Sequence, residues 1–188
     1  LTAGRGDVVL VSGSSGRGKT TFVMTLIGLI KPLGGAISWG GMPVAQIDPR
    51  LLRAKFGYAG PEPYLIDADI RANLCFGLED KVFTDKELED ALRLARADFV
   101  FDLPGGLSHV LREAGEGISA GQKQRLALTR CVLRKPEVLL LDEATSNIDE
   151  DTETEIMNAL IAEFPQTMII AVSHRSSLRR YATILIDL

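Results

Sequence analysis

The sequence predicts an α/β domain with a mainly parallel central sheet, and three observations in its 188 residues support this prediction. Short strands alternate with helices towards both ends of the chain, which is typical of parallel sheets. The apolar stretches at residues 7–12 and 138–141 have no polar face, as expected of central strands covered on both sides. A mostly helical stretch at residues 69–130 interrupts the alternation, and we interpret it as a subdomain inserted into a single domain whose core is formed by residues 1–68 and 131–188.

The first part of the predicted core begins with a strand over residues 7–12 and a helix over residues 19–30. Pro32 and the pair Gly34-Gly35 are expected to end this helix. After it we expect short strands over residues 36–39 and 56–59, a turn at Gly40-Gly41 between them, and a loop over residues 60–69.

The predicted subdomain is helical from residue 69 to residue 97, and Thr84 and Glu87 have the spacing of a capping box. An apolar stripe follows that cap, formed by Leu88, Ala91, Leu92 and Ala95. We expect a loop at residues 103–106 and a second long helix over residues 120–133. The rest of the core is predicted as a strand over 138–141, a helix over 151–164, and strands over 167–172 and 183–186.

The composition narrows the classes of protein that remain. A net charge of −4 does not favour a nucleic-acid partner. We find no apolar stretch long enough to span a bilayer and no signal peptide, so a cytosolic location is the default, with attachment to a membrane protein left open. Cys75 and Cys131 show no metal-ligand spacing, and we interpret them as reduced thiols.

Residues 13–20 read GSSGRGKT and directly follow the first apolar strand. This is the P-loop pattern in the context that it needs, between a strand and a helix. Glycines let successive N–H groups point at phosphate oxygens, and the start of the helix adds the positive end of its dipole. Lys19 would bind the outer phosphates and the Thr20 hydroxyl would ligate Mg²⁺, whereas the alternative is an ordinary glycine-rich turn. The candidate nucleotide-binding residues here are Gly13, Ser14, Ser15, Gly16, Arg17, Gly18, Lys19, Thr20 and Thr21.

Two acidic residues, Asp142 and Glu143, follow the second apolar strand. We expect the Asp142 carboxylate at the carboxyl end of a central strand, where it would associate with Mg²⁺, usually through a water molecule. Glu143 would polarise a water for attack on the terminal phosphate. The alternative is that the two acids merely cap a helix.

Residues 118–125 read ISAGQKQR, and with this stretch the chain resembles the ATP-binding cassette (ABC) ATPases. The signature of that family usually reads LSGGQ and continues into a basic helix. Ile118 and Ala120 depart from it, whereas Ser119, Gly121 and Gln122 match. A stretch of this kind on its own would more often be an ordinary helix N-cap.

The other motifs of the chain stand in the order of that family. VLLLDEATS at residues 138–146 leads into a D-loop at 146–149, and His174 has the position of the switch histidine. The stretches IRANLCFG (70–77), DLPGGL (102–107) and the segment 113–115 resemble exporter-type cassettes, which are fused to or paired with transmembrane domains. The resemblance covers nearly all of residues 7–187, and it identifies the predicted fold as a P-loop NTPase core with an inserted helical subdomain that carries the signature.

The resemblance implies that two cassettes dimerise head to tail and hold two ATP molecules, with the P-loop of one facing the signature of the other. Ser119 and the Gly121 amide would contact the γ-phosphate, Gln122 belongs to the same segment, and Asp149 would help to join the two sites. The implied partners are a second cassette and the transmembrane domains of a transporter, on the cytoplasmic side of a membrane. The implied cofactors are ATP and Mg²⁺, with Thr20 and Asp142 as metal ligands and Lys19, Glu143 and His174 as catalytic residues.

The sequence departs from the family pattern in three places. Pro61 stands where the family has the glutamine of the Q-loop, and neither its side chain nor its nitrogen offers a metal ligand or a donor; the adjacent Glu62 would substitute only if the loop shifted. The residues before Gly13 include no aromatic side chain to stack on adenine. The chain stops at Leu188, where cassettes continue, so we expect it to be part of a longer polypeptide.

The leading hypothesis is an ATPase domain that powers an exporter-type transporter. Pro61 motivates a second one, a degenerate regulatory domain that binds ATP and hydrolyses little of it. The third is a soluble ABC ATPase that acts in DNA repair or translation, although neither the coiled coil nor the second cassette typical of those proteins occurs in this sequence.

Overall fold

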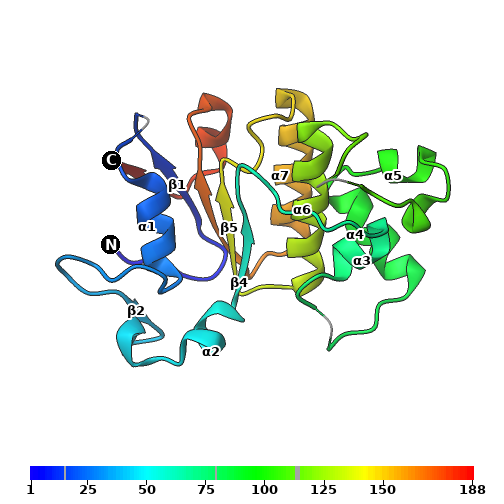
Figure 1. Ribbon diagram of the computed structural model, residues 1–188. Coiled ribbons are helices and arrows are strands. Elements are labelled where there is room, and N and C mark those ends of the chain that lie inside the picture. Colours follow the sequence, from blue (N-terminus) through cyan, green and yellow to red (C-terminus); the bar gives the residue numbers. More distant parts are fainter. Residues whose placement is uncertain (15, 79, 113–114) are drawn as a thin grey trace. The chain divides into compact units, whose positions relative to one another are not determined.

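The chain folds into two compact units. The computed structural model describes residues 1–14, 16–78, 80–112 and 115–188. One unit consists of Leu1–Tyr58, Pro136–Asp142 and Gln166–Leu188, and the other of Ala59–Lys135 and Glu143–Pro165 (Figure 1). Each of them has its own packed interior and is described by itself.

A five-stranded sheet organises the first unit, with the order β4-β5-β6-β1-β7. The registers of β1 against β6 and β7, and of β5 against β6, are all parallel. The strands are β1 (Val8–Ser12), β4 (Phe56–Ala59), β5 (Val138–Asp142), β6 (Met168–Val172) and β7 (Ile184–Asp187). The predicted α/β fold with a mainly parallel sheet is therefore confirmed, and the two wholly apolar strands β1 and β5 lie inside the sheet.

The core of this unit lies against the sheet. Side chains that alternate along β1, β5 and β6, such as Val9, Leu140 and Ile170, share one buried cluster with Val23 and Ile27 from the helical segment that follows β1. Burying each such aliphatic side chain stabilises the fold by about 1.5–3 kcal/mol. The strands are apolar on both faces because both faces are buried.

Helix α1 (Lys19–Leu26) is shorter than the predicted helix over residues 19–30. The chain leaves the helix at Ile27, and Gly28 takes a left-handed conformation with φ 73°. The Leu29 N–H then donates to the Met24 carbonyl at 2.9 Å, a bond that closes the end of the helix. The helix therefore ends before it reaches the expected stop signals at Pro32 and Gly34-Gly35.

In the connection after α1 the structure has a strand at Ser38–Trp39, inside the predicted strand over residues 36–39, and the predicted turn at Gly40-Gly41, whereas the elements that follow the turn were not predicted. A short hairpin pairs β2 (Ser38–Trp39) with β3 (Met42–Pro43) through a turn in which Gly40 and Gly41 have φ 56° and 83°. A 3-10 turn, Val44–Gln46, leads to α2 (Pro49–Arg53). Asp48 caps this helix by accepting the Arg50 N–H at 2.7 Å, and the sequence Asp-Pro is a recognisable helix start.

The second unit is helical. Its helices are α3 (Ile70–Cys75), α4 (Asp85–Leu94), α5 (Phe99–Asp102), α6 (Ala120–Arg134) and α7 (Glu150–Glu163). Helix α6 packs on α3 and α4, and α4 also contacts α7. Leu74, Leu126 and Ile156 are buried in this unit. The four residues of the apolar stripe predicted after Thr84 are buried as well, so this stripe faces the interior.

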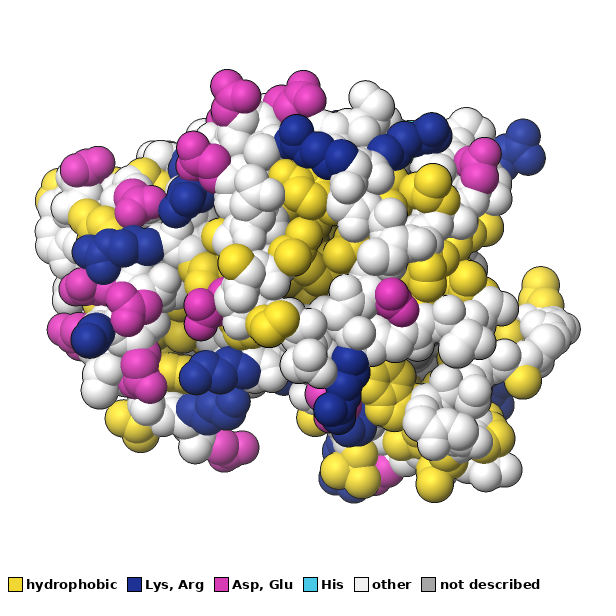
Figure 2. Space-filling model, turned by 180° about the vertical axis from the view of Figure 1, so that it is seen from behind, with side chains coloured by type: hydrophobic (Ala, Val, Ile, Leu, Met, Phe, Trp, Pro, Cys, Tyr) yellow, Lys and Arg dark blue, Asp and Glu magenta, His cyan; other side chains and the backbone are white. Residues whose placement is uncertain are grey.

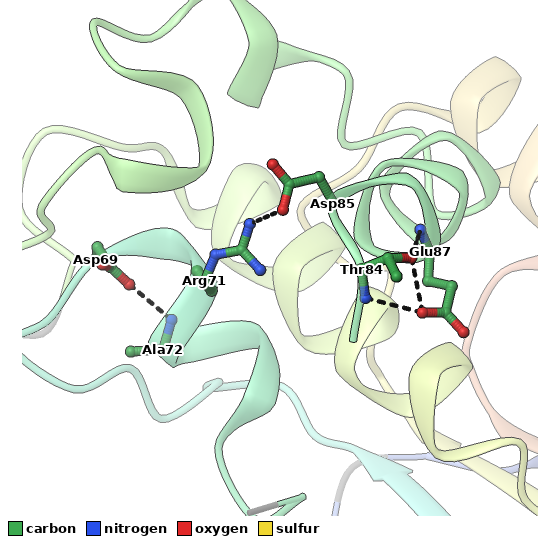
Figure 3. A network of polar contacts seen from close by, with 6 residues as sticks. All are labelled: Asp69, Arg71, Ala72, Thr84, Asp85 and Glu87. Atoms are coloured by element: carbon green, nitrogen blue, oxygen red, sulfur yellow. Dashed lines mark hydrogen bonds and ion pairs between the residues drawn. The ribbon is translucent and has the colours of Figure 1, made fainter. Parts of the chain in front are cut away.

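Polar contacts at the helix starts stabilise the second unit (Figure 3). The Thr84 hydroxyl accepts the Glu87 N–H at 3.3 Å and the Glu87 carboxylate accepts the Thr84 N–H at 2.8 Å, which confirms the predicted capping box. Asp69 caps α3 by accepting the Ala72 N–H at 2.7 Å. Arg71 and Asp85 form an ion pair between the starts of α3 and α4.

Two surface properties bear on function. Across the described ranges, none of the helices has the length and the apolar character needed to cross a membrane. On the face drawn in Figure 2, basic and acidic side chains lie intermingled.

Cys131 is buried and Cys75 partly buried, and both are free thiols.

Candidate functional site

The glycine-rich loop of the first unit begins where β1 ends. Gly13 has φ 139°, and a Cβ at this position would lie 2.4 Å from the Leu188 carbonyl oxygen. The Leu188 N–H donates to the Ser12 carbonyl at 3.0 Å, so the end of the chain packs directly on the start of the loop. A residue with a side chain would have to displace that backbone, which makes glycine necessary here.

The next two glycines leave the loop open. Gly16 and Gly18 have φ 80° and 90°, and a Cβ at either would meet no described atom within 4 Å. Gly18 is the N-cap of α1 and offers no side chain to its first turn. The N–H groups at the start of this helix are therefore available to an anion, which the helix dipole also favours.

Lys19 is buried at 6% exposure although it carries a charge. Its ammonium donates to the carbonyls of Gly13 at 2.9 Å and of Ser14 at 3.1 Å, so the side chain folds back over the loop. An ammonium has three N–H bonds, and these two acceptors among the described residues leave one for a phosphate oxygen.

The remaining predicted loop residues lie at the surface. Thr20 and Thr21 are exposed in the first turn of α1, and Thr21 accepts the Thr25 hydroxyl through its carbonyl. Arg17 is exposed and its Nε donates to the Ser14 hydroxyl at 3.3 Å. The predicted residue Ser15 lies outside the described residues, as do the first two residues of the segment 113–115.

Three strand ends meet at the same edge of the sheet. In the parallel register Val11 pairs with Val172, and Val172 pairs with Asp142. The Ser173 N–H donates to the Val11 carbonyl at 3.2 Å, which brings the exposed His174 to the edge from which the glycine-rich loop leaves β1. Ligands of open parallel sheets bind at this carboxyl edge.

Asp142 is 1% exposed and has a neighbour that sequence reasoning missed. Tyr58, on β4, donates its hydroxyl to the Asp142 carboxylate. Burial, and then the charge and hydrogen bond of Asp142, raise the pKa of Tyr58 to about 12. The shift keeps the phenol protonated beyond the ordinary pKa of a tyrosine, so its hydroxyl remains a donor to the carboxylate. The one hint in the sequence to this contact was that Tyr58 lies on a predicted short strand.

In the second unit, Glu143 has an unusual backbone. Its φ is 52°, a left-handed conformation that costs a residue with a Cβ roughly 1–2 kcal/mol. Its carbonyl accepts the Ser146 N–H at 3.1 Å. Strain of this kind persists where the surrounding structure enforces it, and it is often found at functional residues. The N-cap of α7, the helix that follows, is Asp149, which accepts the Thr152 N–H at 2.9 Å.

The predicted signature residues form the start of α6. The Ser119 hydroxyl accepts the Gln122 N–H at 3.2 Å and the Gln122 side chain accepts the Ser119 N–H at 2.7 Å, a complete capping box. The Ser119 hydroxyl can still donate its proton to an anion. Gly121 has a packing role, since a Cβ there would lie 2.5 Å from the Asn147 carbonyl oxygen.

Gln124 is the second residue that sequence reasoning missed. It lies within the quoted stretch ISAGQKQR, is 1% exposed and bonds the segment that begins at Glu143. Its Nε2 also donates to the carbonyl of Pro61, the residue at the predicted position of the family glutamine, at 3.2 Å. The sequence shows only a second glutamine in this polar stretch, and its burial became visible in the structure.

A glycine-rich loop joins a strand to a helix, a lysine folds over it, and an acidic residue ends another strand at the same edge of the sheet, with β6 between the two strands. These features define a P-loop nucleotide-binding protein. The sequence matches the family model of ABC transporters over residues 1–146. The chain belongs to the ABC transporter family, as its motifs predicted.

Two curated relatives illustrate the match. ABC transporter B family member 26, chloroplastic, from Arabidopsis thaliana is 35% identical over 176 residues, which are 92% of this chain and 25% of that protein. The multidrug resistance ABC transporter ATP-binding and permease protein from Lactococcus lactis is 36% identical over 172 residues, 91% of this chain and 29% of that protein. The chain therefore spans less than a third of the length of these relatives.

A solved structure supports the exporter-type resemblance. A bacterial Atm1-family ABC exporter with ATP bound matches the fold with a TM-score of 0.90 and 31% sequence identity. The match covers 98% of this chain and 32% of that one. The predicted fold, with a helical part that carries the signature, is thus the fold of a nucleotide-binding part of an exporter.

Proposed function

We propose that this chain is the ATP-hydrolysing, nucleotide-binding domain of an exporter-type ABC transporter. The observation that supports this most strongly is the glycine-rich loop, whose open backbone and buried Lys19 ammonium suit the phosphates of a nucleotide. The residues also suit Mg²⁺, because the exposed Thr20 hydroxyl and the buried Asp142 carboxylate are oxygen ligands. Magnesium, when bound, would offset the charge of the phosphate oxygens.

The roles of the side chains follow from their chemistry. Lys19 and the loop amides would bind the phosphates, and Asp142, which accepts a hydrogen bond from Tyr58, would help to hold Mg²⁺. Glu143 takes the proton of the attacking water, and His174 orients that water and the γ-phosphate. A general base contributes about 10²–10⁴-fold in rate when it is well placed.

The partners that we propose are a second cassette and transmembrane domains. Ser119 and Gly121 would contact the nucleotide of the second cassette in a head-to-tail dimer, with Gln122 in the same segment and Asp149 joining the sites. Support comes from the relative whose name combines ATP-binding and permease parts and from the exporter of similar fold. The domain would then lie on the cytoplasmic side of a membrane. We propose the inserted subdomain at residues 69–130 as the part that presents the signature to the partner.

The first test is calorimetric titration of Mg-ATP into this chain, into Lys19→Ala and into Lys31→Ala. Lys31 is an exposed lysine outside the loop and serves as the matched control. We expect binding by the wild type and by Lys31→Ala, and its loss in Lys19→Ala. Equal binding by all three variants would contradict a working P-loop. ATP turnover by the full-length protein then separates an ATPase from a domain that binds without hydrolysis.

A further inference from the structure

Gln124 is a buried amide at the centre of a polar cluster in the second unit. It is 1% exposed and lies in α6, five residues after the N-cap Ser119. Its Oε1 accepts the Asn147 N–H at 3.0 Å. Its Nε2 faces the Ser146 hydroxyl at 3.0 Å, the Pro61 carbonyl at 3.2 Å and the Glu143 carbonyl at 3.4 Å.

The partners of Gln124 determine which way its amide points. A backbone N–H such as that of Asn147 only donates, so the oxygen of the amide must face it. The two carbonyls, of Pro61 and Glu143, only accept, so the nitrogen must face them. The amide thus cannot be reversed, and its two N–H bonds are shared among three acceptors.

Gln124 therefore joins three segments that are far apart in the sequence. They are the loop that contains Pro61, the backbone at Glu143, and the turn at Ser146 and Asn147. The close packing of Gly121 against the Asn147 carbonyl brings the start of α6 to the same turn.

The contact at Glu143 has a particular consequence. The residue has φ 52°, and its carbonyl accepts both the Ser146 N–H and the Gln124 amide. Both bonds fix the plane of the peptide that follows Glu143, and so restrict the rotation that would relax the left-handed conformation. The direction of the Glu143 side chain depends on this backbone, because Cα and Cβ turn with it.

We propose that Gln124 is a positioning residue for Glu143. It keeps the backbone of Glu143 in its left-handed conformation and thereby aims the carboxylate, while it ties the same segment to the loop of Pro61 and to the signature helix. The proposal rests on the proposed ATPase function, in which Glu143 is the general base. Gln124 itself touches no reacting atom.

The test uses the full-length protein and measures kcat and KM for Mg-ATP together with the unfolding midpoint. Gln124→Glu keeps the oxygen that accepts the Asn147 N–H but turns a carboxylate oxygen towards two carbonyls. Gln124→Met keeps the approximate volume and removes all four hydrogen bonds. We expect either change to lower kcat by about 10-fold or more, because small misplacements of a catalytic group are costly, while KM stays within about 2-fold.

Two further variants separate positioning from folding. Gln166→Glu makes the same chemical change at an exposed glutamine and should leave kcat at the wild-type value. Ser146→Ala removes only one of the hydrogen-bond partners of Gln124. Because Ser146 is exposed, this change should affect folding little, and it should lower kcat by a smaller factor than the Gln124 variants.

The outcomes distinguish the proposals. A lower kcat with unchanged KM and unfolding midpoint supports the positioning role. Wild-type kcat in both Gln124 variants overturns it and leaves the ATPase function standing. A loss of kcat that follows a rise in KM and a lower unfolding midpoint, with Ser146→Ala like the wild type, also overturns it, because Gln124 would then be structural only. A wild-type protein that binds and hydrolyses no ATP overturns both proposals.

Discussion

The two units of the protein position their polar groups by different means. In the first unit, the loop after β1 relies on backbone conformation: its glycines adopt positive φ values, and Lys19 folds back onto main-chain carbonyls. In the second unit, side-chain hydrogen bonds position the polar groups, in the capping boxes of α4 and α6 and in the cluster around Gln124. A backbone site depends on residues that lack a Cβ, whereas a side-chain site depends on matched donors and acceptors.

The largest expected effect is on ATP turnover and comes from Glu143 in the second unit, whereas we assign nucleotide affinity to the first unit. Replacing Glu143 with Gln removes the base but keeps the size of the side chain, so ATP turnover of the full-length protein should fall by about 10²–10⁴-fold. Nucleotide affinity, which we assign to the first unit, should stay near the wild-type value. Turnover and calorimetric binding measure the two quantities, with Glu163→Gln at an exposed acid as the control. Equal turnover by Glu143→Gln and the wild type would remove Glu143 from the mechanism.

The next effect tests whether the start of α6 needs a residue without a Cβ. Gly121→Ala would place a carbon 2.5 Å from the Asn147 carbonyl oxygen, so the backbone must shift. We expect a loss of about 1–3 kcal/mol in the free energy of unfolding, the usual cost of overpacking. Urea denaturation measures it. Gly34→Ala, where the structure offers open space and no positive φ is recorded, should cost less; a similar loss in both variants would contradict the packing argument.

A smaller effect separates capping from nucleotide contact within the second unit. Ser119→Ala and Thr84→Ala each remove the N-cap of a helix, and each should lower the free energy of unfolding by about 1 kcal/mol. Only Ser119 has a proposed role towards ATP, so only Ser119→Ala should lower turnover in the full-length protein. If Thr84→Ala lowered turnover as much, the loss would come from reduced stability.

The smallest effect appears at alkaline pH and tests the contact between Tyr58 and Asp142. The pKa of Tyr58 is raised from 10.0 to about 12 by burial and by Asp142, so the folded protein keeps this proton where the unfolded chain loses it. The contribution to stability is complete below pH 10 and is lost as the pH rises from about 10 to about 12. Ultraviolet titration of the wild type and of Tyr58→Phe should show that one tyrosine ionises late. The idea fails if the late step persists in Tyr58→Phe.

Much of the fold could be predicted from the sequence because its signals are local. The apolar strands β1, β5 and β6 and the capping box at Thr84 all appear within a few residues. The predicted helix is longer than α1 because Pro32 is a stronger stop signal in the sequence than a single glycine. In the structure, the chain leaves the helix earlier, just before Gly28, which has a positive φ. The hairpin after α1 was missed as a pair because each of its strands has only two residues.

The sequence by itself determined the family and the residues of its motifs, since a P-loop and a signature are defined by chemistry at fixed spacing. The tertiary structure alone decided three things: the contact of Tyr58 with Asp142, the strained backbone of Glu143, and the convergence of Pro61, Glu143 and Ser146 on Gln124. The physical reason is distance along the chain. Gln124 lies 63 residues from Pro61 and 22 residues from Ser146, and no local pattern records which buried donors and acceptors will meet when helices pack.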